Sequence, residues 1–209
     1  MMRSAGGPPA VPPAAGRRPS RDERAAEPAA EQPARPPALH VELIDVLTAE
    51  GHPTGIRKPK SEVHRDGDWH RAAHIWIIAP DGRFLLQRRS FRKENNPGLW
   101  DVSAAGHLSA GESASEAAVR ETFEEIGLQL SPDDLRHIAT LRQISILNNN
   151  TYFDHEFHEV FIVQRDVDVP SLELDPEEVA EVKWVSELRP DDTFVPHGEE
   201  YDLVSRSSR

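Results

Sequence analysis

Four glutamates lie close enough in the sequence to act on one metal ion. Glu121, Glu124 and Glu125 follow the spacing i, i+3, i+4, and Glu112 precedes them on the same segment. Residues with this spacing are neighbours on one side of an α-helix. Clustered carboxylates supply the hard oxygen ligands that Mg²⁺ and Mn²⁺ prefer, and such ions bind phosphate-containing substrates. Glutamates are also common on solvated helix surfaces, so the cluster becomes informative only through its surroundings.

The segment that carries these glutamates has the signature of a capped helix. Ser113 and Glu116 form a capping box, and Gly127 is placed to end the helix. An apolar stripe with the spacing i, i+4, i+7 is expected to pack on the core: Val119, Phe123 and Ile126. The glutamates are then predicted on the opposite side. Arg120 is placed to pair with Glu112 and so to fix the preceding glycine-bearing loop against the helix.

Short apolar runs separated by turn signals predict β-strands on both sides of this helix. The predicted strands are residues 41–47, 74–78, 83–88, 99–103, 136–147, 156–164 and 179–185. Residues 51–55 are predicted to form a loop, and a helix is expected around residues 199–204. A helix set among many strands indicates an α/β fold.

Composition divides the chain into two parts. Residues 1–38 contain half of the 18 prolines and almost no large aliphatic side chains, so they are predicted to be a disordered Pro/Ala-rich tail. Residues 39–209 are predicted to form one domain, with a net charge of −14. Such acidity argues against sequence-independent binding of nucleic acid. No apolar run is long enough to span a membrane, and there is no cysteine for disulfides, thiolate metal sites or cysteine nucleophiles. We therefore expect a cytoplasmic protein without nucleic-acid or membrane partners.

Residues Gly106 to Leu128 resemble the Nudix box, G-x5-E-x7-R-E-U-x-E-E-x-G-U, where U is a bulky apolar residue. Eight of the nine defined positions match, and the exception is Thr122. The resemblance implies a Nudix fold, an α/β/α sandwich around a mixed β-sheet. It also implies a hydrolase that cleaves small diphosphate-containing substrates with Mg²⁺ or Mn²⁺.

The resemblance also implies a role for each residue of the box. The glutamates would bind the metal and orient or deprotonate water: Glu121, Glu124 and Glu125. Glu112 would be a further metal ligand or a support for the ligands. Gly106, Arg120 and Gly127 would be structural. A homodimer is common in the family, although the sequence leaves the oligomeric state open.

Upstream segments are similar to the isopentenyl-diphosphate isomerase branch of the family: 69–77, 85–89, 97–100 and 106–107. In that branch Arg89 and Lys93 would grip the diphosphate, with Lys58 or Lys60 in a similar role. His70, His107 and Glu159 match metal-site residues of the isomerases, and His107 is also expected to contact substrate. The second metal-site glutamate of the isomerases is replaced by Phe157, which leaves open whether His70, His107 and Glu159 bind a second metal.

Three functions compete on this evidence. The intact glutamates favour a metal-dependent Nudix hydrolase. An isomerase-like enzyme is the alternative, but the isomerases need a catalytic cysteine at the position of Ala105. A non-catalytic domain that senses a nucleotide would be expected to lose glutamates that this chain keeps. The substrate stays open among nucleoside diphosphates, nucleotide sugars, prenyl diphosphates and thiamine diphosphate.

Overall fold

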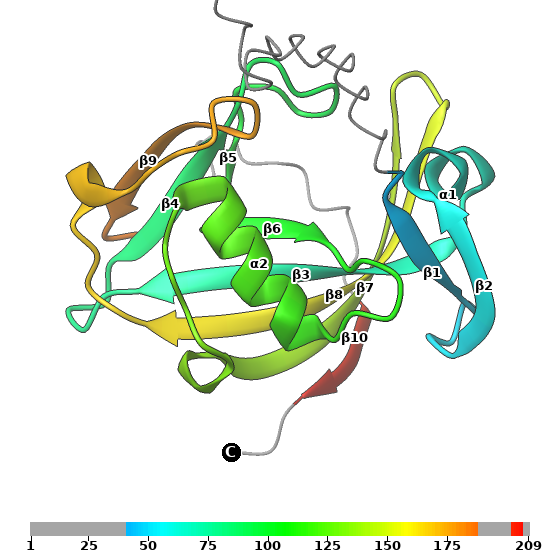
Figure 1. Ribbon diagram of the computed structural model, residues 1–209, viewed down its shortest axis with the longest axis horizontal. Coiled ribbons are helices and arrows are strands. Elements are labelled where there is room, and N and C mark those ends of the chain that lie inside the picture. The colour runs from blue at the N-terminus through cyan, green and yellow to red at the C-terminus, as the bar shows by residue number, and fades with distance from the viewer. Residues whose placement is uncertain (1–40, 188–201, 207–209) are drawn as a thin grey trace, which may run out of the picture. The chain divides into compact units, whose positions relative to one another are not determined.

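The structure is a computed structural model that describes residues 41–187 and the strand at 202–206 (Figure 1). The tail predicted at residues 1–38 lies outside the described residues. The helices are α1 (Lys60–Asp66) and α2 (Ala114–Ile126), with short 3-10 turns η1 (Pro132–Asp134) and η2 (Val169–Ser171). The strands are β1 (Leu43–Leu47), β2 (Pro53–Pro59), β3 (Trp69–Ile78), β4 (Phe84–Arg89), β5 (Trp100–Asp101), β6 (Ala104–His107), β7 (Arg136–Leu147), β8 (Tyr152–Gln164), β9 (Val179–Val185) and β10 (Asp202–Arg206).

These strands form one mixed sheet around β3. The main path is β10-β7-β8-β3-β1-β2, while β4 and β6 also pair with β3, and β5 and β9 pair with β4. The β3–β8 pair is parallel and the other pairs are antiparallel. Helices and a mixed sheet confirm the predicted α/β Nudix architecture. The sheet positions the site because β6 pairs with residues 72–75 of β3 and β8 pairs with β3 along its whole length.

The core lies between the sheet and α2, which crosses β3 and β6 in Figure 1. Ala73, Ile75 and Ile77 alternate along β3 and are fully buried in this core. Successive strand residues point to opposite faces, so His70 and His74 face away from α2. The ring of His64 in α1 contacts that of His70. The two helices therefore lie on opposite faces of the sheet.

Two local predictions are wrong. Residues 53–55 of the loop predicted at 51–55 belong to strand β2, which pairs with β1 across a turn at Gly51. Residues 202–204 belong to β10 rather than to a helix, and residues 199–201 lie outside the described part. Pairing with β7 satisfies backbone groups at a sheet edge, and this long-range gain is invisible in the local sequence.

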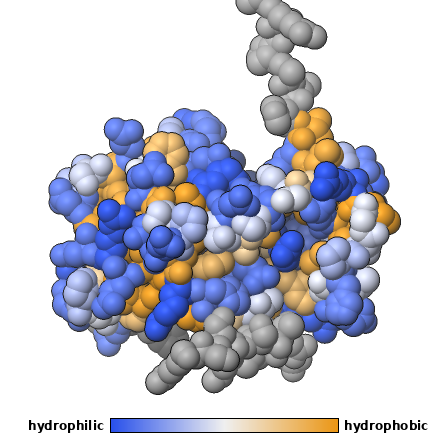
Figure 2. Space-filling view, turned by 60° about the horizontal axis from the view of Figure 1, so that its bottom comes forward, coloured by the Kyte–Doolittle hydropathy of each residue, from blue (hydrophilic) through white to orange (hydrophobic). Residues whose placement is uncertain are grey.

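The surface is dominated by polar side chains. Figure 2 shows one face on which hydrophilic residues prevail and hydrophobic ones gather in small groups. Large hydrophobic residues are exposed at scattered positions: Val41, Leu43, Ile56, Phe91, Phe123, Ile144 and Ile146. Neither helix among the described residues is long and apolar enough to cross a membrane.

Candidate active site and metal centres

Helix α2 forms as its capping signals predict. The Ser113 side chain accepts a hydrogen bond from the Glu116 backbone N–H, and the Glu116 carboxylate accepts one from the Ser113 N–H. Gly127 ends the helix in the left-handed conformation, with φ 69°. A Cβ at Gly127 would also lie 2.8 Å from the Glu173 carbonyl oxygen, so a larger residue would be excluded by contact as well as by conformation.

The buried side of α2 differs from the predicted apolar stripe. Phe123 is 52% exposed, whereas Thr122 is fully buried and donates from Oγ1 to the Ala118 carbonyl. Glu125 is also buried and faces the sheet. The small side chains of Ala117 and Ala118 let the helix approach the sheet so closely that a carboxylate, not a large apolar group, fills the space beside β6.

Glu125 is held by two hydrogen bonds. Its Oε2 accepts from the Ala105 N–H of β6 and from Gln87 Nε2 of β4, both at 3.0 Å. Burial, reinforced by the negative charge of Glu121, raises the pKa of Glu125 to about 8. A buried carboxylate with no bonded cationic side chain is the kind of group that a divalent cation stabilises.

Glu121 lies directly against β6, and this contact explains the glycine at the start of the box. A Cβ at Gly106 would stand 2.1 Å from the Glu121 carboxyl carbon. Only glycine lets the carboxylate approach the strand so closely. Burial also raises the pKa of Glu121, although Arg120 opposes the shift. The raised pKa values of both carboxyls reflect negative charge gathered in a poorly solvated space.

Arg120 organises the acidic cluster. Its Nε and Nη2 donate to the two oxygens of Glu112, each at 2.9 Å, which confirms the predicted pair. Its Nη1 donates to Glu121 at 2.6 Å and to Glu124 at 2.9 Å. Glu112 also accepts from the Ser109 N–H and thereby fixes the loop. These bonds make Glu112 a structural support. Glu124, 57% exposed, is more accessible than Glu121 and Glu125.

A cleft of about 1230 Å³ runs past these glutamates. Basic side chains also line it, namely Lys60, Arg89, Arg92 and Lys93, together with further acidic ones: Glu42, Glu94, Asp175, Glu177 and Glu178. Arg89 donates to the Asn95 carbonyl, and its Nη1 lies 3.5 Å from an oxygen of Asp101. Lys93 pairs with Glu178. Lys58 is engaged by Asp66 and Asp68 instead, so Lys60 is the lysine that the structure brings to the cleft.

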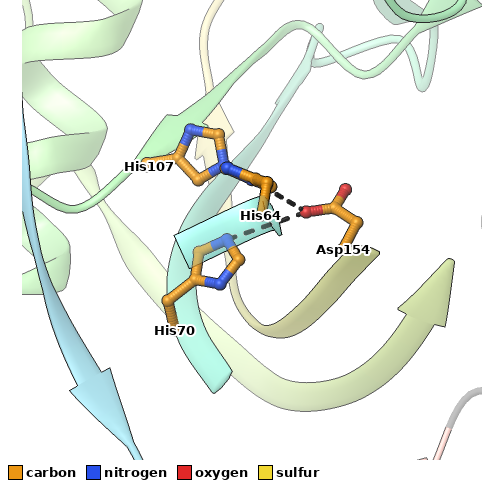
Figure 3. A group of neighbouring side chains, drawn as sticks. All are labelled: His64, His70, His107 and Asp154. Carbon is orange, nitrogen blue, oxygen red and sulfur yellow. Dashed lines mark ion pairs between the residues drawn. The ribbon is translucent and has the colours of Figure 1, made fainter. Parts of the chain in front are cut away.

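A second group of potential ligands lies on the other face of the sheet. One ligand atom each from His64, His70, His107 and Asp154 gathers within 4.8 Å (Figure 3). They come from α1, β3, β6 and β8 respectively. The Asp154 carboxylate oxygen is 3.2 Å from His64 Nε2 and 3.7 Å from His70 Nε2. We call this group the histidine centre.

The atoms of the histidine centre have the features of metal ligands. Nδ1 of His64 bonds the Lys60 carbonyl and Nδ1 of His70 bonds the Asp68 carbonyl, which turns each Nε2 toward the group. The three Nε2 atoms and Asp154 Oδ1 are buried without hydrogen-bond geometry to one another. Burial lowers the pKa of His107 to about 4, so this imidazole is in the neutral form that binds metal. Three nitrogens and one carboxylate suit a divalent transition-metal ion.

The acids at the histidine centre differ from the predicted one. Glu159 pairs with His137 at 2.9 Å and accepts from Thr140, outside the metal-capable groups of the described residues. Alternation along β8 turns Phe157 and Glu159 to one face and Asp154 and Glu156 to the other. The Glu156 carboxylate lies 3.2 Å from His107 Nε2 and 3.4 Å from His70 Nε2.

Sequence reasoning also missed His64, because the segment that became α1 shows no helical period. Two features of the sequence could have served as signals. His64 lies just before β3 and His70 lies at its start, and Asp154 and Glu156 are two residues apart on β8, so they share one face. Of the predicted site residues, the helix glutamates, Arg89, Lys93 and His107 all line the one cleft.

Comparisons with known proteins agree with this geometry. The NUDIX domain family model matches residues 68–200. Nudix hydrolase 3 of Arabidopsis thaliana is 42% identical over 147 residues, which cover 69% of this chain. The chain spans about a fifth of the length of that protein, 19%. Isopentenyl-diphosphate Delta-isomerase 2 of Photorhabdus laumondii is 33% identical, covering 71% of this chain and 79% of that protein.

Among solved structures, that of DR0079 from Deinococcus radiodurans superposes with a TM-score of 0.53 at 19% identity. It covers 69% of this chain and 83% of the other, and shows a shared fold. The family match takes in α2, β6 and most of the cleft lining, whereas Lys60 and His64 precede it. The chain belongs to the Nudix family.

Proposed function

We propose that this chain is a divalent-metal-dependent hydrolase that cleaves the phosphoanhydride bond of a small organic diphosphate. The observation that carries the proposal is the placement of Glu121, Glu124 and Glu125 in one cleft with the basic side chains of Lys60, Arg89 and Lys93. Acidic and basic groups that line one cleft match a substrate whose phosphates are bridged to carboxylates by metal.

The three glutamates and Arg120 would have different roles in the reaction. Glu121 and Glu125 would hold a Mg²⁺ or Mn²⁺ ion, and their raised pKa values fit carboxylates that a cation stabilises. Such an ion, when bound, neutralises phosphate charge and lowers the pKa of bound water. Glu124 is exposed to the cleft and is placed to orient or deprotonate the attacking water. Arg120 keeps Glu121 and Glu124 at a fixed separation, so the water and the phosphate meet in a reactive geometry.

Arg89, Lys93 and Lys60 would bind the diphosphate. Arg89 is 17% exposed and its guanidinium is oriented by the Asn95 carbonyl, so little side-chain entropy is lost on binding. The histidine centre would hold a transition-metal ion at the other end of the cleft, since His64 and His107 line it as well. Electrostatic attraction from these groups would favour a small, strongly anionic substrate.

The test is a panel of nucleoside diphosphates, nucleotide sugars, prenyl diphosphates and thiamine diphosphate, with Mg²⁺ or Mn²⁺ and chromatography of the monophosphate products as the readout. Glu124→Gln and Glu125→Gln are expected to lower turnover at least about 100-fold while leaving the circular dichroism spectrum unchanged. Glu181→Gln is the matched control, since Glu181 is an exposed glutamate outside the cleft. Full activity in a folded Glu125→Gln protein would refute the proposal.

An isomerase is the second candidate, and the histidine centre together with the isomerase relatives favours it. Against it, β6 presents Ala105 where the isomerases need a cysteine thiol. One assay separates the two: isopentenyl diphosphate is supplied with Mg²⁺, and the products are analysed. Phosphate release supports the hydrolase, and a dimethylallyl product supports the isomerase.

A further inference from the structure

A second set of potential ligands lies beside the histidine centre, further along the same two strands. His74, Glu156 and His158 each bring one ligand atom within 4.8 Å of the other two. In the parallel β3–β8 register, His70 pairs with Glu156 and Ala72 with His158. Alternation therefore places all three side chains on the face opposite α2. The rings of His74 and His158 stack with centroids 3.9 Å apart and planes 22° apart.

Glu156 belongs to both sets. Its Oε1 approaches His107 and His70 of the histidine centre, at 3.2 and 3.4 Å. Its Oε2 lies 2.7 Å from His158 Nε2. The side chain is 8% exposed, so bulk solvent has little access to these oxygens. A carboxylate with one oxygen turned to each of two groups has the geometry of a bridging ligand.

A polar cavity of about 120 Å³ opens onto the three residues. It is several times larger than the roughly 10–15 Å³ that one water needs. Gln143 on β7 also lines it, and its Oε1 is buried with no hydrogen-bond partner in the described part of the chain. Nε2 of Gln143 donates a hydrogen bond to Ser145 Oγ. This bond sets the orientation of the amide and leaves Oε1 as its unpaired atom. Such an oxygen is costly to bury unless something binds it.

We infer that His74, Glu156 and His158 bind a divalent transition-metal ion, which Glu156 links to the ion of the histidine centre. Two imidazole nitrogens and a carboxylate favour Mn²⁺, Fe²⁺, Co²⁺ or Zn²⁺ over Mg²⁺ and Ca²⁺, which prefer oxygen ligands alone. The cavity leaves space for water ligands, and the Gln143 oxygen can accept a hydrogen bond from one of them. The inference rests on the proposed function, in which the histidine centre holds a transition-metal ion.

Metal counting tests the inference without reference to turnover. The metal-free full-length protein is loaded with Co²⁺, freed of excess ion by gel filtration and analysed by mass spectrometry for bound metal. His74→Ala and His158→Gln are each expected to bind one Co²⁺ per chain fewer than the unmodified protein. His155→Ala is the matched control: this β8 histidine packs on Trp69 and lies outside both groups. Ions bound by the helix glutamates are common to all variants and cancel in the difference.

Electron paramagnetic resonance of the Mn²⁺-loaded protein provides a second readout. Two ions that share the Glu156 carboxylate should show spin coupling, which should disappear in His74→Ala and in His64→Ala. Equal Co²⁺ counts in His74→Ala and the unmodified protein, with an uncoupled spectrum, would overturn the inference. If His158→Gln fails to fold, the less buried His74 carries the test. If the unmodified protein hydrolyses no diphosphate but His74→Ala still binds one Co²⁺ fewer, the result would count against the proposed hydrolysis and not against this site.

Discussion

Replacing Glu125 by glutamine should change how the stability of the metal-free protein depends on pH. Burial raises the pKa of Glu125 to about 8, above the 4.5 of an unperturbed glutamate. As pH rises above 4.5, the unfolded chain releases this proton while the native chain retains it. The unfolded state then binds fewer protons, so the free energy of unfolding falls. The penalty is absent below about pH 4.5 and complete above about pH 8.

The magnitude follows from linkage. One proton of difference changes the free energy of unfolding by about 1.4 kcal/mol per pH unit. Between pH 5 and pH 8 the Glu125 contribution therefore amounts to roughly 4 kcal/mol. Glutamine does not titrate and keeps an oxygen that can accept from the Ala105 N–H. The Glu125→Gln protein should gain stability relative to the unmodified protein by this amount across the interval, and the difference should level off above pH 8.

The assay is urea unfolding in EDTA, followed by circular dichroism at several pH values from 5 to 9. The quantity compared is the difference in free energy of unfolding between the Glu125→Gln and unmodified proteins, followed as a function of pH. An effect of the substitution on packing that is the same at every pH does not alter this dependence. Glu181→Gln, at a side chain that is 53% exposed, is the control for the general effect of replacing a carboxylate by an amide. A difference between the Glu125→Gln and unmodified proteins that stays flat from pH 5 to pH 8 would refute the reasoning.

Three further predictions concern α2 and its contact with β6. Gly106→Ala should displace the Glu121 carboxylate and lower hydrolysis at least about tenfold, with a stability loss of about 1–3 kcal/mol measured by urea unfolding. Thr122→Val should shift the free energy of unfolding by less than about 1.5 kcal/mol, because it removes one buried hydroxyl whose bond is local; a larger loss would show that the hydroxyl is structural. Phe123→Ala should cost less than about 1 kcal/mol and Ile126→Ala about 2–5 kcal/mol in thermal unfolding, and the reverse order would contradict the observed burial.

The features that could be predicted from sequence are those specified by local interactions. The capping box and Gly127 fix α2 within its own segment, and the spacing of the box fixes which glutamates lie together. The pairing of Arg120 with Glu112 spans only the loop and the first turns of that helix. Each of these could be predicted because the residues involved are close in the chain.

The features that sequence reasoning missed depend on which strands pair. Whether Glu156 or Glu159 faces the histidines is decided by the register of β8 against β3, and a shift of one residue would reverse it. His64 joins the group only because α1 packs beside β8 and β1. On α2, the buried side carries Ala118, Thr122 and Glu125 and leaves Phe123 exposed, an arrangement that the hydrophobic pattern does not express.

Strand β6 separates two groups of potential metal ligands, which can vary independently. Gly106 faces the glutamates, whereas His107 and the Ala105 side chain face the histidines. A point substitution on one face leaves the ligands of the other in place, so one reaction can be lost or acquired while the other centre persists. Insertion of a single residue in β6 would instead exchange the two faces and destroy both. The two groups of ligands can therefore change independently through the side chains of β6, provided that the length of the strand stays the same.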